Sequence, residues 1–406
     1  MRVLVVGGGR WQVPLCESLD SWGYQIVLVD PNANSPCGRF AERIIQADIR
    51  DVNSILDQIS TMSQQPSLIL TDQSDYAIET ASLISSHLDL PGITPSVCEI
   101  FRNKLRFRRF LESELNVKFP KYFQISNKSE LDSAIDSLGF PFVLKPADSQ
   151  SSRGFTVVSS ADIDLGMILE NVLSNTKLKY VVAEQFISGT EVTIEGICIK
   201  GRHHALTTGS KLHFRPGIAS RIDYPARIQK IYLERMIEFH NDMIEATGLE
   251  TALTHSEYLI DAVNGNFAPV EIACRGGGNL ISSDIVPWMT GLDVYKLLVD
   301  ALNGIDSKIS VKTLSRCATL QFFEFGSGHV SKTPDFGKLS GFSGRLISEF
   351  HVEAGQIVGP AVDDRSRHGF AILLGAKLEE LEDARQEIEQ LFDEVSKPRQ
   401  QNGESD

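Results

Sequence analysis

The chain has 406 residues, enough for two or three domains with substantial cores. It carries 39 Lys and Arg against 53 Asp and Glu, a net charge of −14, which argues against a protein whose main task is to bind nucleic acid or an anionic membrane. Hydrophobic residues make up 42% and charged residues 23%, the proportions of an ordinary globular protein, so wholesale disorder is excluded.

Short apolar runs alternate with amphipathic segments from residue 1 to about 90, which predicts a small parallel α/β unit. The expected strands are 3–6, 25–29, 43–47 and 67–70, and the expected helices are 11–22, 52–60 and 74–88. A cluster of Pro and Gly at 90–95 closes the unit.

Three glycines, 7–9, follow the first expected strand, where backbone amides could bind an anion at a helix N-terminus. As a dinucleotide fingerprint the loop is incomplete, because Gln12 stands where the third glycine belongs, although Asp30 lies at about the distance of a ribose ligand. A glycine turn needed for tight packing or for a small substrate is therefore favoured over a nicotinamide site.

The next segment is typical of an α+β block. A basic helix is expected at 96–115, followed by strands at 121–125, 142–145, 155–158, 180–186 and 191–199 and helices at 128–138 and 162–175. Residues 211–229 lack clear periodicity and contain Pro216, Gly217 and Pro225, so we expect a long lid or substrate loop there.

The last third of the chain is expected to hold a helix at 231–247 and a hairpin of strands 254–261 and 267–273. A β-rich region with a final helix at 378–395 follows. The polar residues 397–406 are expected to be disordered.

The six cysteines are spread along the chain without a CxxC pair, so neither a zinc ribbon nor a dense disulfide framework is expected: Cys16, Cys37, Cys98, Cys198, Cys274 and Cys317. No run approaches 18 apolar residues, and the N-terminus lacks the apolar segment and cleavage site of a signal peptide. We therefore expect reduced thiols, a cytoplasmic location and no membrane span.

Two lysines and a serine-rich loop could bind phosphate groups. Lys145 leaves an apolar strand, and Lys104 belongs to the basic helix, most of whose charges are expected to form a solvated face. The loop up to Gly154 could close over phosphates with its amides and hydroxyls. The alternatives are a lysine whose head reaches solvent and an ordinary turn.

Two pairs of glutamates are candidate ligands. Glu184 and Glu191 flank an expected strand–turn–strand and could bind an adenine amine and ribose hydroxyls, or they are simply exposed. Glu257 and Glu271 fall inside otherwise apolar strands, where an unpaired carboxylate is costly. A shared divalent metal would remove that cost, and Arg275 could neutralise a transferring phosphate; the alternative is a structural salt bridge among these three.

The order of these residues resembles the ATP-grasp superfamily of carboxylate–amine ligases, over about residues 1–305. The closer similarity is to its L-amino-acid (dipeptide) ligases, because the segments 349–352 and 366–370 also resemble theirs. The resemblance implies a mixed α/β and α+β chain with the ATP-grasp fold. Its parts would be a Rossmann-like unit (1–93), a two-lobed ATP-grasp region (94–305, mobile lid lobe about 121–190), a small β-rich C-terminal α+β domain (306–396) and the tail.

The resemblance also implies a role for each matching residue of this chain. Lys104, Lys145, Ser151, Ser152 and Gly154 would contact ATP phosphates; Glu184 and the backbone of Phe186 and Ile187 would meet adenine, and Glu191 the ribose. Glu257 and Glu271 would hold Mg²⁺ (or Mn²⁺), and Arg275 would be the catalytic residue at the γ-phosphate and acyl phosphate. Ala273 stands where the family often has Asn, which leaves the number of metal ions open.

Substrate ligands are the least defined. His255, Arg215, Arg221, Gly277 and Gly278 are the candidates. The basic residues of the segment 211–229 could clamp carboxylates or belong to a solvated basic loop: Lys211, His213, Arg215, Arg221 and Arg227. His255 could instead be a core histidine.

The implied activity is ATP-dependent formation of an amide or peptide bond between a small carboxylate, in the first place an amino acid, and an amine, through an acyl phosphate, with release of ADP and phosphate. The alternatives are an ATP-grasp ligase of purine-biosynthesis or carboxylase type and a non-catalytic ATP-binding regulatory protein. A homodimer with small-molecule substrates and no nucleic-acid partner is expected.

Overall fold

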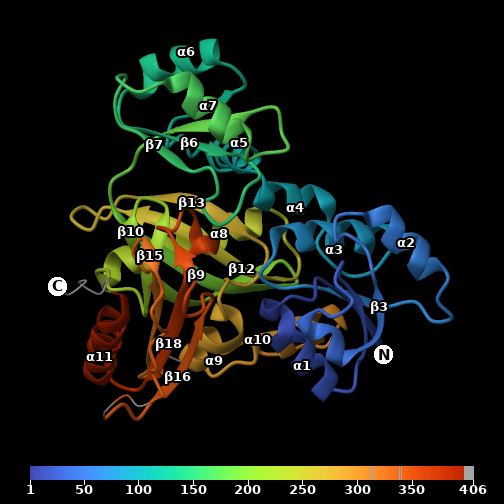
Figure 1. Cartoon of the computed structure of the whole chain (residues 1–406). Helices are drawn as coiled ribbons and strands as arrows, with labels where there is room; N and C mark the ends of the chain where they lie inside the picture. Colours follow the sequence, from blue (N-terminus) through green and yellow to red (C-terminus); the bar gives the residue numbers. More distant parts are fainter. Residues whose placement is uncertain (312–313, 338, 340, 397–406) are drawn as a thin grey trace.

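The computed structural model describes residues 1–311, 314–337, 339 and 341–396. Three parts follow one another in Figure 1: a blue N-terminal unit, a teal and green lobe at the top, and a large sheet that continues into the orange and red C-terminal segment. The predicted boundaries at 93 and 305 fall in connections between these elements, and the predicted tail lies outside the described residues.

The N-terminal unit is the predicted parallel sheet, with strand order β3-β2-β1-β4. Its strands are β1 (Arg2–Val6), β2 (Gln25–Val29), β3 (Ala41–Ile45) and β4 (Leu68–Leu70), and its helices are α1 (Val13–Ser21), α2 (Val52–Ser60) and α3 (Asp75–His87). Val3 and Val5 pack in the cluster that includes α1, whereas Leu4 and Val6 pack with α2 and α3. Because both faces are covered, the strand is apolar at every position after Arg2.

The predicted basic helix is in fact two helices, α4 (Pro95–Arg102) and α5 (Lys104–Leu115). They separate at Asn103, whose side chain accepts hydrogen bonds from the amides of Leu105 and Arg106 and so caps α5. The prediction of one continuous helix misses this N-cap, and the break turns Lys104 and Arg108 toward the rest of the protein.

The lid lobe is an antiparallel sheet of order β5-β8-β6-β7. Its elements are β5 (Tyr122–Ile125), α6 (Lys128–Leu138), β6 (Phe142–Pro146), β7 (Thr156–Val158), α7 (Leu165–Leu173) and β8 (Val181–Gln185). Both helices contribute to a small core of their own with β6 and β8, at the top of Figure 1. The serine loop, residues 147–154, connects β6 to β7.

An eight-stranded sheet of order β13-β12-β9-β10-β11-β14-β18-β16 forms the rest of the core. Its first five strands in the chain are β9 (Thr190–Ile199), β10 (Arg202–Arg215), β11 (Ile218–Tyr224), β12 (Ala252–Ile260) and β13 (Phe267–Ala273). The hairpin predicted at 254–273 is confirmed, with Glu257 directly opposite Glu271.

The long loop predicted at 211–229 is wrong, because much of it belongs to the hairpin of β10 and β11, joined by Pro216 and Gly217. A half-buried strand is usually recognised by alternating apolar residues. This pattern is missing in β10, because several of its side chains are charged and form ion pairs within the protein. Lys211 is one of them.

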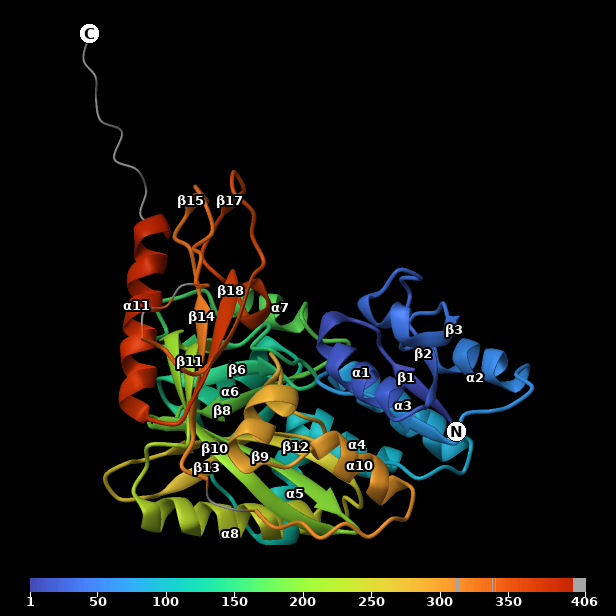
Figure 2. The same ribbon diagram turned by 90° about the horizontal axis from the view of Figure 1, so that it is seen from below.

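The C-terminal strands β14 (Cys317–Phe323), β16 (Arg345–Phe350) and β18 (Gly369–Gly375) extend this same sheet. Apart from three short 3-10 helices (Arg10–Gln12, Pro36–Phe40 and Asp364–Ser366), the remaining elements of the described residues are α8 (Lys230–Ala246), a π-helix (Ile281–Ile285), α9 (Val286–Thr290), α10 (Val294–Leu302), the pair β15 (Gly328–His329) and β17 (Ile357–Val358), and α11 (Leu378–Ser396). Figure 2 shows α11 running alongside β14 and β18, where Leu381 and Ile388 complete a separate core. In the described residues no helix is long and apolar enough to cross a membrane.

Two buried histidines between α8 and the sheet predict that the stability of the fold depends on pH. His203 Nδ1 lies 2.8 Å from Asn241 Oδ1, and its Nε2 lies 2.8 Å from Thr254 Oγ1, so the neutral ring is fully paired. Burial lowers the pKa of His203 to about 4 and that of the adjacent His240 well below its usual value. Between pH 6.5 and 4, His203 is protonated in the unfolded chain but neutral in the folded chain. The free energy of unfolding therefore decreases as pH falls from 6.5 toward 4.

We expect His203 alone to contribute a loss of up to about 3 kcal/mol over that window. Urea unfolding between about pH 7.5 and 4.5 measures it. His203→Gln should flatten part of the decline, and His329→Gln, an exposed residue on β15, should not. Equal slopes for His203→Gln and the unmodified chain would contradict the assignment.

Candidate active site

Two cavities meet at the face of the large sheet. The lobe cavity, about 140 Å³, lies between the lid lobe and strands β9–β13. The junction cavity, about 150 Å³, lies where the N-terminal unit, the sheet and the C-terminal segment come together. Four residues line both cavities: Ser152, Lys211, Glu257 and Glu271. A molecule in one cavity is therefore close to a molecule in the other at these side chains.

Most of the residues predicted to contact a nucleotide line the lobe cavity. They are Lys104, Lys145, Ser152, Glu184, Phe186, Ile187, Glu191, Glu257 and Glu271. Ser151 instead lines the junction cavity, and Gly154 is part of the lining of neither. The fold thus brings together side chains from α5, β6, the serine loop, β8, β9, β12 and β13 that the sequence pattern singles out.

Glu184 lies at the centre of a buried charge triad. Its Oε1 accepts from Arg108 Nε at 2.9 Å, and its Oε2 lies 2.7 Å from Lys145 Nζ. Burial would raise the pKa of Glu184, but the charges of Arg108 and Lys145 outweigh it and lower the pKa to about 2. The carboxylate therefore stays ionised and holds the Lys145 ammonium at the lobe cavity, and the alternative of an exposed Glu184 is wrong.

Sequence reasoning misses Arg108, because the basic run of α5 is typical of a solvated face. Its side chain is only 3% exposed, and besides Glu184 it donates to the carbonyls of Pro269 and Val270 on β13. The composition of the run does not distinguish Arg108 from its solvated neighbours. The signal that could have found it is the start of α5 at the Asn103 cap, which fixes the side of the helix on which Arg108 lies.

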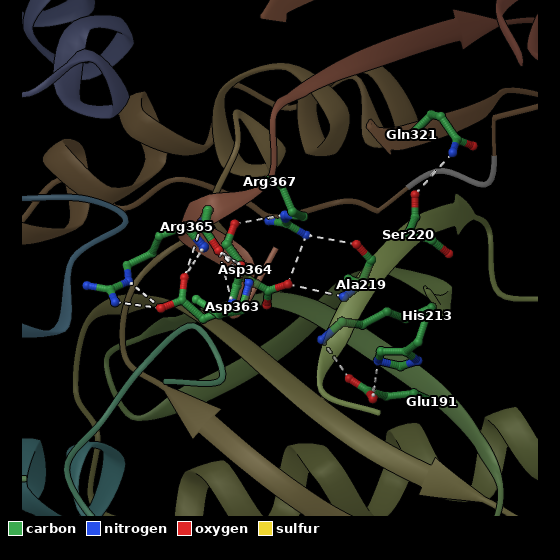
Figure 3. Close-up of polar contacts among 12 residues, drawn as sticks. Glu191, His213, Ala219, Ser220, Gln321, Asp363, Asp364, Arg365 and Arg367 are labelled. Atoms are coloured by element: carbon green, nitrogen blue, oxygen red, sulfur yellow. Dashed lines mark hydrogen bonds and ion pairs between the residues drawn. The ribbon is translucent and has the colours of Figure 1, made fainter. Parts of the chain in front are cut away.

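Lys211 bridges two of the predicted acidic residues. Its Nζ lies 2.7 Å from Glu191 Oε1 and 2.7 Å from Glu257 Oε1, and His213 Nε2 lies 3.0 Å from the other oxygen of Glu191. Burial lowers the pKa of Lys211, but the two carboxylates raise it by more, so the ammonium is charged. Figure 3 shows the Glu191 contacts on the face of the sheet.

Glu257 and Glu271 could hold a divalent cation together with a phosphate ligand. They are paired across β12 and β13, and Lys104 Nζ lies 3.3 Å from Glu271. Among the described residues no group of three or more His, Cys, Asp and Glu side chains could hold a metal ion. Two carboxylate donors nonetheless fit Mg²⁺, which often takes one or two carboxylates and completes its shell with phosphate oxygens and water.

Arg275, at the end of β13, lines the junction cavity and is paired with Asp75 of α3. The predicted alternative of a salt bridge among Glu257, Glu271 and Arg275 is therefore wrong, because the N-terminal unit supplies the partner. Neighbouring Gly276 donates its amide to Asp72 at 2.9 Å, and Asp72 also accepts from Ser282 and Tyr295. The N-terminal unit thus holds the segment after β13.

His255 is charged and faces the junction cavity. Its Nδ1 lies 2.7 Å from Glu195 Oε1 and its Nε2 lies 3.5 Å from Glu257 Oε1. Burial lowers its pKa, but Glu195 and Glu257 raise it to about 10. Gly278 lines the same cavity, and a Cβ at Gly277 would lie 2.9 Å from Glu195 Oε2, so only glycine allows this close approach.

Arg215 and Arg221 do not join the other predicted site residues. Arg215 pairs with Glu324 at 2.7 Å, Arg221 pairs with Asp223 at 3.2 Å, and neither is part of the lining of the two cavities. Both guanidinium groups are instead paired with carboxylates of the protein itself, so the structure does not bring these two predicted carboxylate ligands to the cavities.

Arg367, from the C-terminal segment, lies at the junction cavity, whereas those two arginines do not. Figure 3 shows it between Asp364 and Ala219; Nη1 lies 3.1 Å from Asp364 Oδ1, and the guanidinium stacks on the Phe322 ring at 3.3 Å. Burial lowers its pKa to about 10. Arg367 lines the junction cavity, and the segment 366–370 was the available signal for it.

The three-glycine loop is a packing turn. The amide of Gly8 donates to Asp30 Oδ2 at 2.8 Å, and a Cβ at Gly8 would lie 2.6 Å from Ser35 Oγ. Asp30 thus accepts a hydrogen bond from the glycine loop itself, and this supports the predicted tight turn rather than a dinucleotide-binding site.

Comparison with known proteins identifies the fold. Residues 138–284 match the model of the ATP-grasp domain. Formate-dependent phosphoribosylglycinamide formyltransferase of Prochlorococcus marinus (strain MIT 9515) is 24% identical over 191 residues, 46% of this chain and 48% of that protein. N5-carboxyaminoimidazole ribonucleotide synthase of Staphylococcus aureus (strain COL) is 23% identical over 141 residues, 35% of this chain and 36% of that protein.

The crystal structure of L-amino acid ligase from Bacillus licheniformis superposes with a TM-score of 0.80, at 19% identity, over 96% of this chain and 97% of that one. The chain spans about half the length or less of the two curated relatives named above. The predicted ATP-grasp fold is confirmed.

Proposed function

We propose that this chain, whose residues 138–284 form an ATP-grasp domain, is an ATP-dependent ligase that joins a small carboxylate to an amine and releases ADP and phosphate. One observation carries the proposal: the lobe cavity and the junction cavity meet at Ser152, Lys211, Glu257 and Glu271. A nucleotide in the first cavity would present its terminal phosphate to a substrate in the second.

The lobe cavity suits ATP. The backbone of Phe186 and Ile187 would meet adenine and Glu191 would bind the ribose, since all three residues line this cavity. Lys145, held by Glu184, and Lys104 would neutralise phosphate oxygens beneath the serine loop. Glu257 and Glu271 would hold Mg²⁺ or Mn²⁺, which would further neutralise the phosphates.

The junction cavity suits the carboxylate that accepts the phosphoryl group. Its lining includes the cations Arg275, Arg367 and Lys211 together with His255, which could bind a carboxylate, beside the carboxylates of Glu257, Glu271 and Asp364. A carboxylate oxygen attacks the γ-phosphorus, the bond to ADP breaks, and an acyl phosphate forms. The amine then attacks the acyl carbon, and phosphate leaves. Positioning and charge neutralisation supply the catalysis, while the serine loop keeps water from the acyl phosphate.

The curated relatives favour the purine-biosynthesis alternative over an amino-acid ligase, since their names refer to phosphoribosylglycinamide and to an imidazole ribonucleotide. The likeness to L-amino acid ligase, at 19% identity, is a likeness of fold, and an amino-acid ligase stays the second candidate. The homodimer stays a prediction.

ADP release with magnesium and ATP tests the proposal. The assay would pair formate or bicarbonate with phosphoribosyl amines, and amino acids with each other. We expect release that depends on one carboxylate–amine pair, with a condensed product one water lighter than the sum of the two. ATP binding without release for any pair would overturn the ligase and favour the regulatory alternative.

A further inference from the structure

The serine loop packs against the N-terminal unit, although the contacting residues of that unit lie far from the loop in the sequence. Gln150 Oε1 accepts the backbone amide of Asp75 at 3.1 Å, and Arg153 Nη2 donates to the Tyr76 hydroxyl at 2.7 Å. On its other side, the carbonyl of Ser151 accepts from the amide of Asp364 in the C-terminal segment at 3.3 Å. The loop therefore closes against the first turn of α3 as well as against its own lobe.

Asp75 makes contacts in three directions from that first turn. Its carboxylate accepts from Arg275 Nε, its amide donates to Gln150, and its carbonyl accepts from Arg102 Nε at 3.0 Å. Asp75 thus joins the loop that covers the lobe cavity to the arginine that faces the junction cavity.

Arg275 depends on this partner for its place. Its side chain is 11% exposed, and among the described residues its guanidinium makes one hydrogen bond besides that to Asp75, to the carbonyl of Gly276. Burial alone would lower the pKa of Arg275, but the charge of Asp75 raises it, and Glu271 adds a weaker attraction. Without the Asp75 charge, the Arg275 guanidinium would lose its ion-pair partner and would be free to shift within the junction cavity.

We propose that Asp75 is a positioning residue: its carboxylate holds Arg275 at the junction cavity while its backbone amide seats the closed serine loop. Asp75 therefore contacts both Arg275 and the serine loop, so one residue fixes the position of both. The inference rests on the proposed function, in which Arg275 neutralises the transferring phosphoryl group. A displacement of about 1 Å at such a group can cost about 100-fold in rate.

The first test is kinetic. Asp75→Asn should lower kcat for ADP release about 50-fold and leave KM for ATP within about 3-fold, because the nucleotide contacts remain. Asp75→Glu should recover part of kcat. Glu79→Gln is the matched control: it lies one turn along α3, pairs with Arg102 at 2.7 Å and does not contact Arg275. A kcat for Asp75→Asn equal to that of the control would overturn the proposal.

The second test needs no turnover and so separates this inference from the proposed function. Butanedione modification of Arg275, followed by peptide mass mapping, should be several-fold faster in Asp75→Asn than in the unmodified chain and unchanged in Glu79→Gln. Unchanged modification in Asp75→Asn would overturn the placement. If no substrate pair releases ADP, the ligase fails, yet faster modification still supports the positioning of Arg275 by Asp75.

Discussion

Glu271→Gln should reduce substrate-dependent ADP release by about 100- to 1000-fold, the size expected when a group that stabilises transferring charge is lost. The carboxylate is one of two that face each other across β12 and β13, and its replacement by a neutral amide leaves one negatively charged side chain of that pair for a divalent cation. The measurement is ADP release at saturating ATP and magnesium, with the substrate pair that supports turnover.

The fold should survive this change. Glu271 is partly exposed, and Lys104 keeps its hydrogen bond to the Ser149 carbonyl at 2.7 Å. Thermal unfolding should therefore shift little, and the exposed Glu238→Gln on α8 should leave both rate and stability unchanged. Near-normal turnover in Glu271→Gln would remove the metal assignment and with it the arrangement of the γ-phosphate proposed above.

Glu184→Gln should destabilise the protein by about 3–5 kcal/mol, the cost of leaving buried charges without their partner. Arg108 and Lys145 both point at this carboxylate, and each of the three side chains is at most 7% exposed. Without the negative charge the two cations repel each other in a site that excludes water. Urea unfolding at about pH 7 measures the loss, and ATP binding should weaken with it.

The pH dependence of Glu184 has a defined sign. Because its pKa is about 2, against 4.5 for the free carboxyl, its stabilisation is present above pH 4.5 and is lost as pH falls toward 2. Glu184→Gln should lack this acid limb. Glu112→Gln, an exposed carboxylate on α5, is the control and should change stability by less than about 0.5 kcal/mol. A loss below about 1 kcal/mol in Glu184→Gln would show that the triad does not stabilise the fold.

Local pattern is sufficient wherever neighbouring residues decide the structure. The apolar runs of β1, β2 and β4 predict a parallel sheet because strands buried on both faces must be apolar throughout. Glu257 and Glu271 stand out as carboxylates inside apolar strands, and one hairpin turn is enough to place them opposite each other.

Local pattern fails where distant residues supply the partner. The charged side chains of β10 suggest a loop, because their partners Glu257 and Glu324 lie 46 and 109 residues away. Arg108 looks solvated, because Glu184 is 76 residues further on. No pattern near Asp75 in the sequence predicts its pairing with Arg275, because Arg275 is 200 residues away in the chain.

The sequence by itself thus determined the parallel N-terminal sheet, the ATP-grasp order of motifs and nine of the residues that line the lobe cavity. Only the tertiary structure decided which charges pair, that the serine loop rests on α3, and that Arg367 rather than Arg215 or Arg221 faces the junction cavity. The physical reason is that periodicity and turn chemistry are properties of adjacent residues, whereas the partner of a buried charge is set by how separate elements pack.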